Sequence, residues 1–336
     1  MNQTDFIISS DLVESEQEEG AEPTPELESR GWVVPDGLHG LRLDRVLSEL
    51  VPEFSRSYLQ QLIEHGAVTS GVRILGKPSA RVKAGDTGVV VLRPTPQSQA
   101  FKPEAMDLNV VYEDEYLRVI NKPAGLVVHP APGNWSGTLL NGLLALDASA
   151  GSLPRAGIVH RLDKDTSGVM VVARTRTMMD ALVRMIAARE VSRQYLALAH
   201  KPWQGPPMRA VDAPIGRDPR NRLRMAVVDL NKSPGKPSKT DFYLLQNKEQ
   251  ICWVRCCLHS GRTHQIRVHM ASIGHPLVAD ELYGGGLAGG MQRQALHACR
   301  LAFAHPVSGK TMVFHAPVPD DLGRAMQQWS LSYNPD

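Results

Sequence analysis

The chain has 336 residues, of which 42% are hydrophobic and 21% charged, so it can bury a sizeable core and is expected to form two globular domains. It has no apolar run near the roughly 18 residues of a membrane helix and no signal-peptide pattern, which predicts a cytoplasmic chain without a membrane partner. Net charge is +2, but residues 1–30 hold nine acidic residues and one basic residue, leaving 36 basic and 26 acidic residues after them. A basic body favours a polyanionic partner such as nucleic acid.

Residues 1–32 are predicted to form a disordered acidic tail, because they have little periodic apolar content to offset the entropy of ordering. A small domain is then predicted over residues 33–92. Four apolar residues spaced as on one helix face predict a short helix that ends at Pro52: Leu43, Val46, Leu47 and Leu50. Ser55 is expected to cap a second helix and Gly66 to follow its end, with two strand-like segments after them.

The stretch LRLDRVLSELVPEFSRSYLQQLIEHGAVTSG in this domain resembles the S4 RNA-binding module, a small αL-type unit of ribosomal proteins and RNA-modifying enzymes. Thr69-Ser70-Gly71 stands where that family usually has Val-Asn-Gly. Basic side chains near loops are well placed to bind phosphates, and those taken as RNA-binding candidates are Arg45, Arg56, Lys77 and Arg81.

Three prolines mark residues 93–103 as a linker, and residues 104–330 are expected to form the second domain. Short apolar runs broken by turn residues predict strands in LNVVYEDEYLRVINKPAGLVVHPAPG, GVMVVART, QYLALAH, KTDFYLLQ, ICWVRCCLH and HQIRVHM. A helix is expected at TMMDALVRMIAAR. Because the elements do not alternate strictly as βαβ, we predict an α+β domain with a mixed, mostly antiparallel sheet.

Several apparent cofactor motifs fail. AHPVSGKT, residues 304–311, has Ala304 where a P-loop needs its first glycine. The four cysteines form no zinc-type pairs and are expected to be reduced thiols, most of them buried. His264 and His269 are five residues apart, which on a strand would place them on opposite faces. The sequence therefore predicts neither a metal nor a cofactor.

The loop HRLDKDTSG places two carboxylates, Asp163 and Asp165, before a buried strand. Two carboxylates could serve a glycosidase, but sugar-stacking aromatics are scarce. Two other segments carry complementary chemistry: GRTHQIRVH, residues 261–269, supplies two arginines, and SRQYLALA supplies Tyr195. A carboxylate, a guanidinium that keeps it ionised and an aromatic ring would suit a base lifted out of a nucleic-acid stack, although Arg–Asp pairs and single tyrosines are more often structural.

GIVHRLDKDTSGVMVVART is similar to the signature of the RluA-type pseudouridine synthase family, and further blocks follow in the family's order. They include NKPAGLVVHPAPG, VDAPIGRDP, SGRTHQIRVHM and HPLVADELYGG, and together they cover about residues 103–318. Two positions depart from the family pattern: Ser260 replaces a threonine and Ala279 replaces a glycine.

The resemblance implies a pseudouridine synthase fold and the cofactor-free isomerisation of uridine to pseudouridine. Asp163 would be the catalytic residue, either as nucleophile on the sugar or as base at C2′, and Asp165 a loop residue. Arg267 would pair with Asp163, and Tyr195 would stack on the uracil. Arg161 would hold the nucleotide or clamp the loop. Arg262 would bind RNA.

Within the family, the resemblance is to members that carry an S4 module and modify 23S rRNA, so the expected partner is 23S rRNA or the ribosomal large-subunit particle, bound by a monomer. A synthase acting on other rRNA or tRNA uridines, and a non-catalytic RNA-binding protein, remain the alternatives.

Overall fold

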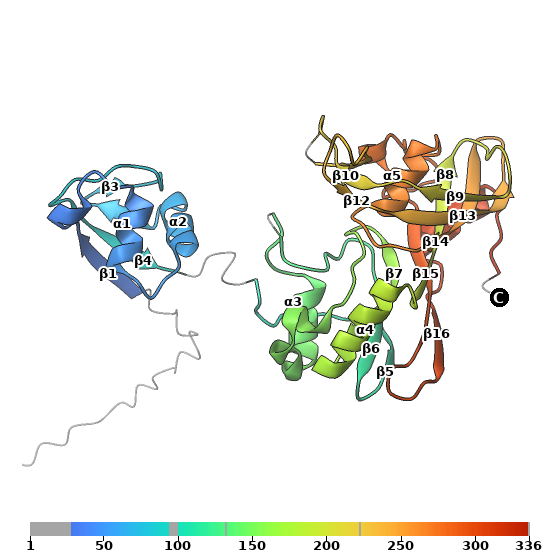
Figure 1. Ribbon diagram of the computed structural model, residues 1–336, viewed down its shortest axis with the longest axis horizontal. Helices are drawn as coiled ribbons and strands as arrows, with labels where there is room; N and C mark the ends of the chain where they lie inside the picture. Colours follow the sequence, from blue (N-terminus) through green and yellow to red (C-terminus); the bar gives the residue numbers. More distant parts are fainter. Residues whose placement is uncertain (1–27, 94–99, 132, 222, 335–336) are drawn as a thin grey trace, which may run out of the picture. The chain divides into compact units, whose positions relative to one another are not determined.

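The computed structural model describes residues 28–93, 100–131, 133–221 and 223–334, and the chain divides after Thr95 into two compact units (Figure 1). Most of the predicted acidic tail lies outside the described residues. Its last five residues, however, belong to strand β1 (Glu28–Val33), which pairs along its length with β4 (Thr87–Leu92). The small domain therefore includes residues from Glu28 onward, before the predicted boundary at residue 33, because Trp32, only 3% exposed, anchors this strand in the core.

The smaller unit contains the two predicted helices, α1 (Leu43–Leu50) and α2 (Arg56–Glu64). Its antiparallel sheet has the order β1-β4-β2-β3, where β2 is Val68–Ser70 and β3 is Arg73–Ile74. The hydroxyl of Ser55 accepts a hydrogen bond from the Tyr58 N–H at 3.3 Å, and Gly66 has a φ of +71° after the second helix. Both helix-end predictions are confirmed.

The predicted linker is only partly described, because residues 94–99 lie outside the described ranges. Its last residues pack on the larger unit: the side-chain amide of Asn141 donates to the carbonyls of Ala100 and Lys102 at 3.2 and 2.8 Å. Ala100 itself is 2% exposed. The larger unit thus begins a few residues before the predicted boundary at residue 104.

A mixed sheet of nine described strands forms the centre of the larger unit, with only β7 and β15 pairing in parallel. Its order along the main path is β5-β6-β7-β15-β8-β14-β13-β9, and β16 pairs with β15. The bounds are β5 Val110–Glu113, β6 Leu117–Lys122, β7 Ser167–Ala173, β8 Ser192–His200, β9 Met208–Asp212, β13 Lys239–Asn247, β14 Ile251–Leu258, β15 Leu296–Ala304 and β16 Thr311–His315. The predicted α+β class with a mostly antiparallel sheet is confirmed.

Helices cover both faces of this sheet. Helices α3 (Leu139–Leu146) and α5 (Gln265–Ser272) share one hydrophobic core with Tyr195, whereas α4 (Arg176–Ala188) and α6 (Asp320–Gln328) belong to cores on the opposite side. Successive strand residues point to opposite faces, so Tyr195 and Leu196 enter different cores. A small sheet of β10 (Ile215–Arg217), β11 (Met225–Val227) and β12 (Gly235–Lys236) completes the unit.

Most predicted elements of the larger unit are present, including the helix at α4 and the strands at β5 to β8, β13 and β14. The apolar run 126–129 forms no strand; instead, the carbonyls of Val127 and Val128 accept hydrogen bonds from the start of α3. The predicted strand HQIRVHM is a helix, α5. No helix in the described residues is long and apolar enough to cross a membrane.

Candidate active site

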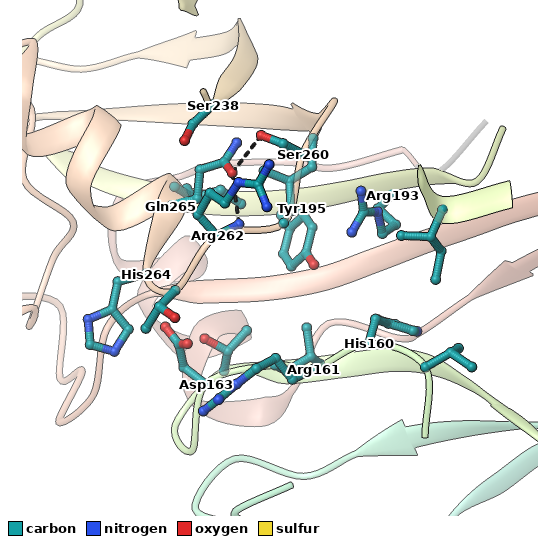
Figure 2. A pocket seen from close by; sticks show the side chains of 18 of the residues that line it. His160, Arg161, Asp163, Arg193, Tyr195, Ser238, Ser260, Arg262, His264 and Gln265 are labelled. Atoms are coloured by element: carbon teal, nitrogen blue, oxygen red, sulfur yellow. Dashed lines mark hydrogen bonds between the residues drawn. The ribbon is translucent and has the colours of Figure 1, made fainter. Parts of the chain in front are cut away.

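A cavity of about 1090 Å³ opens in the larger unit, between the loop before β7, strand β8 and the segment from the end of β14 into α5 (Figure 2). It brings together the three segments on which the sequence prediction rested. Its lining holds two acidic residues, Asp163 and Asp212, and seven basic ones: Arg155, Arg161, Arg189, Arg193, Lys239, Arg262 and Arg267. This excess of positive charge suits a polyanionic ligand.

The loop that carries Asp163 is fixed through its backbone. The carbonyl of Asp163 accepts from the Thr166 N–H at 3.1 Å, and the carbonyl of Lys164 accepts from the Gly125 N–H at 2.9 Å. The fully buried ammonium of Lys122 also donates to the Lys164 carbonyl at 2.9 Å, as well as to two carbonyls of its own loop. Burial lowers the pKa of Lys122, an effect that the negative charges of Asp165 and Asp163 oppose.

Asp163 and Asp165 face different surroundings although one residue separates them. Asp163 lines the large cavity (Figure 2), whereas Asp165 lines a smaller one, of about 370 Å³. The carbonyl of Asp165 accepts a hydrogen bond from the Arg293 guanidinium at 2.8 Å, and Arg293 also pairs with Asp321 at 2.7 Å. Only Asp163 is thus placed to meet a ligand of the large cavity.

The contact expected between Asp163 and Arg267 is present, with Nη1 of Arg267 donating to Oδ2 of Asp163 at 3.2 Å. A second carboxylate, Asp280, takes two further bonds from Arg267, both at 2.8 Å. Arg267 and Asp280 have side chains only 9% and 1% exposed. Burial lowers the pKa of Arg267, but the hydrogen bonds and charge of Asp280, and then Asp163, raise it above its ordinary value. The guanidinium therefore stays charged beside Asp163.

The ring of Tyr283 completes the surroundings of Arg267, whose guanidinium carbon lies 5.0 Å from the ring centroid. The Tyr283 hydroxyl accepts from the Met225 N–H at 3.0 Å and lies 2.8 Å from Nδ1 of His264. These contacts fix the aromatic face on which the arginine rests, which is a favourable cation–π arrangement.

Tyr195 lies in the cavity wall opposite the Asp163 loop (Figure 2). It is 5% exposed and is held in β8 between β14 and β15. Burial raises the pKa of its hydroxyl to about 12, an effect that the positive charge of Arg193 opposes and the negative charge of Asp163 reinforces. The hydroxyl therefore stays neutral near pH 7 and can act only as a hydrogen-bonding group in its resting state.

The segment HQIRVHM was wrongly predicted as a strand. It forms α5, preceded by His264 in the left-handed region at φ +56°. All positions from Gln265 to Met270 are buried, so the helix is covered on every side and lacks the apolar periodicity that identifies an amphipathic helix. The strand-face argument for His264 and His269 therefore does not apply. His269 instead contacts the Thr240 hydroxyl at 2.9 Å and the Ala213 carbonyl at 3.0 Å.

The predicted RNA-binding residues fall into two groups. Arg161 and Arg262 are exposed residues that line the cavity, and the guanidinium of Arg262 donates to the Pro237 carbonyl at 3.2 Å. The other four lie on the smaller unit and are also exposed: Arg45, Arg56, Lys77 and Arg81.

Three of those four residues already have partners within their unit, and Arg45 pairs with Glu49 at 3.4 Å. Arg56 pairs with the fully buried Asp44 at 2.9 Å, and hydrogen bonds from Arg42, Gln60 and Arg56 hold the pKa of Asp44 well below its usual range despite burial. Arg81 donates to the Gly40 carbonyl at 2.7 Å. Each has a structural contact in addition to any contact with RNA.

The sequence prediction missed three residues that hold the loop of Asp163 and the side chain of Arg267 in place: Lys122, Asp280 and Arg293. Each is a charged residue in or beside an apolar segment. A charged side chain in such a segment is usually paired with an opposite charge or held by hydrogen bonds. Lys122 belongs to the block NKPAGLVVHPAPG and Asp280 to the block HPLVADELYGG. No cluster of three or more His, Cys, Asp or Glu that could hold a metal ion occurs in the described part of the chain.

Comparisons with known proteins agree with this geometry. The family model described as RNA pseudouridylate synthase matches residues 116–272, and the S4 domain model matches residues 41–87. A protein of Neisseria meningitidis serogroup B named ribosomal large subunit pseudouridine synthase D is 46% identical over 335 residues, covering 96% of this chain and 85% of that protein. An Escherichia coli protein of the same name is 42% identical and covers 84% and 89%.

Among solved structures, human RNA pseudouridylate synthase domain containing 4 is similar in fold, with a TM-score of 0.53 at 23% identity over 67% of this chain and 94% of that one. The chain belongs to the RluA-type RNA pseudouridylate synthase family and carries an S4 domain. It is accordingly an isomerase of RNA uridines.

Proposed function

We propose that this chain isomerises specific uridines of 23S rRNA to pseudouridine, without a cofactor, and that Asp163 is its catalytic group. The observation that carries the proposal is the placement of Asp163 in a basic cavity, with Arg267 on one side of it and Tyr195 opposite. The curated relatives named ribosomal large subunit pseudouridine synthase D support the choice of RNA.

The reaction breaks the bond between N1 and C1′, lets the uracil turn in the site and joins C5 to C1′, while the proton of C5 is lost and N1 gains one. Atoms and electrons balance without an oxidant. Asp163 serves either as nucleophile at C1′ or as base at C2′, and the hydrogen bond from Arg267 holds its carboxylate in position. The Tyr195 ring packs on the flipped uracil, a common way to hold an extruded base. Arg161, at the cavity wall, holds the nucleotide.

The test compares two neighbouring substitutions, Asp163→Asn and Asp165→Asn. Asp163→Asn is expected to bind 23S rRNA and to form no pseudouridine, measured by tritium release from 5-tritiated uridine RNA. Asp165→Asn should retain activity, because Asp165 lines the smaller cavity and not the one that holds Asp163. Substantial activity in Asp163→Asn would refute the assignment. RNA binding without pseudouridine formation by the wild-type chain would instead indicate a binding protein.

The smaller unit is proposed to bind phosphates of the same RNA through Arg45, Arg56, Lys77 and Arg81, and thereby to raise affinity. The enzyme would work as a cytoplasmic monomer on 23S rRNA or on the large-subunit particle. Removing residues 1–92 should weaken substrate binding or change the sites modified. Mapping pseudouridines in rRNA and tRNA of a deletion strain identifies the target, and lost sites in tRNA would contradict the 23S assignment.

A further inference from the structure

Arg193 is a buried arginine in β8 that lies in the wall of the large cavity (Figure 2). The residue is only 6% exposed. Its Nε has no hydrogen-bond partner, and within the described residues no carboxylate lies at ion-pair distance from its guanidinium. The side chain also packs closely against Gly261, in the segment that leads from β14 into α5. A Cβ added at Gly261 would lie 2.9 Å from Nη1 of Arg193.

Other buried arginines of this unit are paired. Arg118, 3% exposed, contacts Glu113 at 2.6 Å and Asp147 at 3.5 Å, and Arg267 contacts two carboxylates. A buried charge without a partner is strongly destabilising, so such a residue is retained where a ligand supplies the missing charge. The positive charge of Arg193 acts on another residue of the cavity wall, His160. Burial, together with this charge, lowers the pKa of His160 to about 3.

We infer that Arg193 binds a backbone phosphate of the nucleotide that enters the cavity. The inference rests on the proposed function, in which Tyr195 packs on the target uracil. Arg193 and Tyr195 are two residues apart on one strand, so they point to the same face with a spacing of about 6.6 Å. A ring on the base and a guanidinium beside it can hold the base and the sugar-phosphate of one nucleotide together.

A phosphate is favoured over a uracil carbonyl by charge. The phosphodiester carries a full negative charge, which compensates the guanidinium, and arginine bonds to phosphate oxygens in a charge-assisted and often bidentate way. Of the two acidic residues in the lining, Asp163 already pairs with Arg267, and neither lies at ion-pair distance from Arg193.

Binding is measured in an Asp163→Asn background so that the RNA is not turned over. The RNA is a hairpin of 23S rRNA that the wild-type chain modifies. Arg193→Met is compared with Arg193→Lys, which keeps the charge, and with Arg176→Met, whose arginine is exposed and outside the cavity. Arg193→Met should raise the Kd about tenfold at low salt and reduce the slope of log Kd against log salt by about 0.7–0.9, the value for one phosphate. Arg193→Lys should keep most of the slope, and Arg176→Met should match the parent.

Two further measurements separate a ligand contact from a structural role. Without RNA, Arg193→Met should melt at or above the temperature of the parent, whereas Arg118→Met should melt below it. Only Arg118→Met removes an ion-pair partner from carboxylates, since Glu113 and Asp147 would keep Arg174 alone. On hairpins with one neutral methylphosphonate beside the modified uridine, the parent should lose affinity at one position where Arg193→Met is indifferent.

An unchanged salt slope and an unchanged Kd in Arg193→Met would overturn the inference, even if kcat fell, since the residue would then act on the base. A lower melting temperature for Arg193→Met than for Arg118→Met would also overturn it. If the wild-type chain forms no pseudouridine on any RNA, the proposed function fails. The slope comparison is then made on the full 23S transcript, where a loss of about one phosphate contact would still support an anion site at Arg193.

Discussion

The substitution Asp280→Asn tests whether the site depends on the second carboxylate of Arg267. Asp280 is 2% exposed and takes two hydrogen bonds of 2.8 Å from that guanidinium. Removing one partner of a buried ion pair costs about 3–5 kcal/mol. Arg267 keeps its bond to Asp163, and asparagine keeps one acceptor, so we expect the free energy of unfolding to fall by about 2–3 kcal/mol.

Urea unfolding followed by tryptophan fluorescence measures this loss, since four of the five tryptophans lie in the larger unit: Trp135, Trp203, Trp253 and Trp329. The matched control is Asp180→Asn, because Asp180 pairs with Arg176 on the surface and should contribute less than about 0.5 kcal/mol. The rate of pseudouridine formation should fall in Asp280→Asn, where Arg267 is less firmly aimed at Asp163, and not in the control. Equal stabilities of the two variants would refute the reasoning.

Three further outcomes are expected. Burial lowers the pKa of His297 to about 4 from 6.5, so its stability contribution is complete above pH 6.5 and is lost as the pH falls through about 4, by up to about 3 kcal/mol. Urea titrations between pH 7 and 4 should therefore give a flatter profile for His297→Gln, and a parallel profile would contradict this. Ala279 lies at φ +58°, so Ala279→Gly should raise the free energy of unfolding by about 0.5–1 kcal/mol in the same assay, whereas Ala271→Gly inside α5 should lower it by about 1 kcal/mol. Tyr195→Phe should keep the RNA affinity of the parent and Tyr195→Ala should weaken it by about 1–3 kcal/mol in filter binding, so an equal loss in both would indicate that the hydroxyl, not the ring, binds the base.

The strands around the site were predictable because their apolar runs are short and bounded by turn residues, as at QYLALAH. The pairing of Asp163 with Arg267 was expected from the resemblance to the family, whereas the charges of the segment alone left Arg262 and Arg267 as candidates. The helical form of α5 was not, because a helix buried on all sides gives no amphipathic pattern. The two carboxylates of the loop are equivalent by spacing, and only long-range contacts, such as that of Arg293 with the Asp165 carbonyl, separate them.

Asp280 and Arg193 illustrate a second limit of prediction from the sequence. A charged residue among apolar neighbours indicates burial, but its partner can lie anywhere in the chain. Asp280 has its partner 13 residues away, whereas Arg193 has none within the described residues. The sequence gives the same signal for a structural pair and for a ligand contact, and only the surroundings of the side chain distinguish them.

The double hydrogen bond to the Lys164 carbonyl has a consequence for engineering. Lys122 and Gly125 fix the peptide between the two aspartates. Asp163 therefore faces the large cavity and Asp165 the smaller one. A residue inserted on either side of Lys164 would shift the register and could exchange the carboxylate that faces the cavity. The length of this loop is therefore as constrained as its composition, and attempts to alter the choice of substrate should begin at the cavity rim, where Arg161 and Arg262 are exposed.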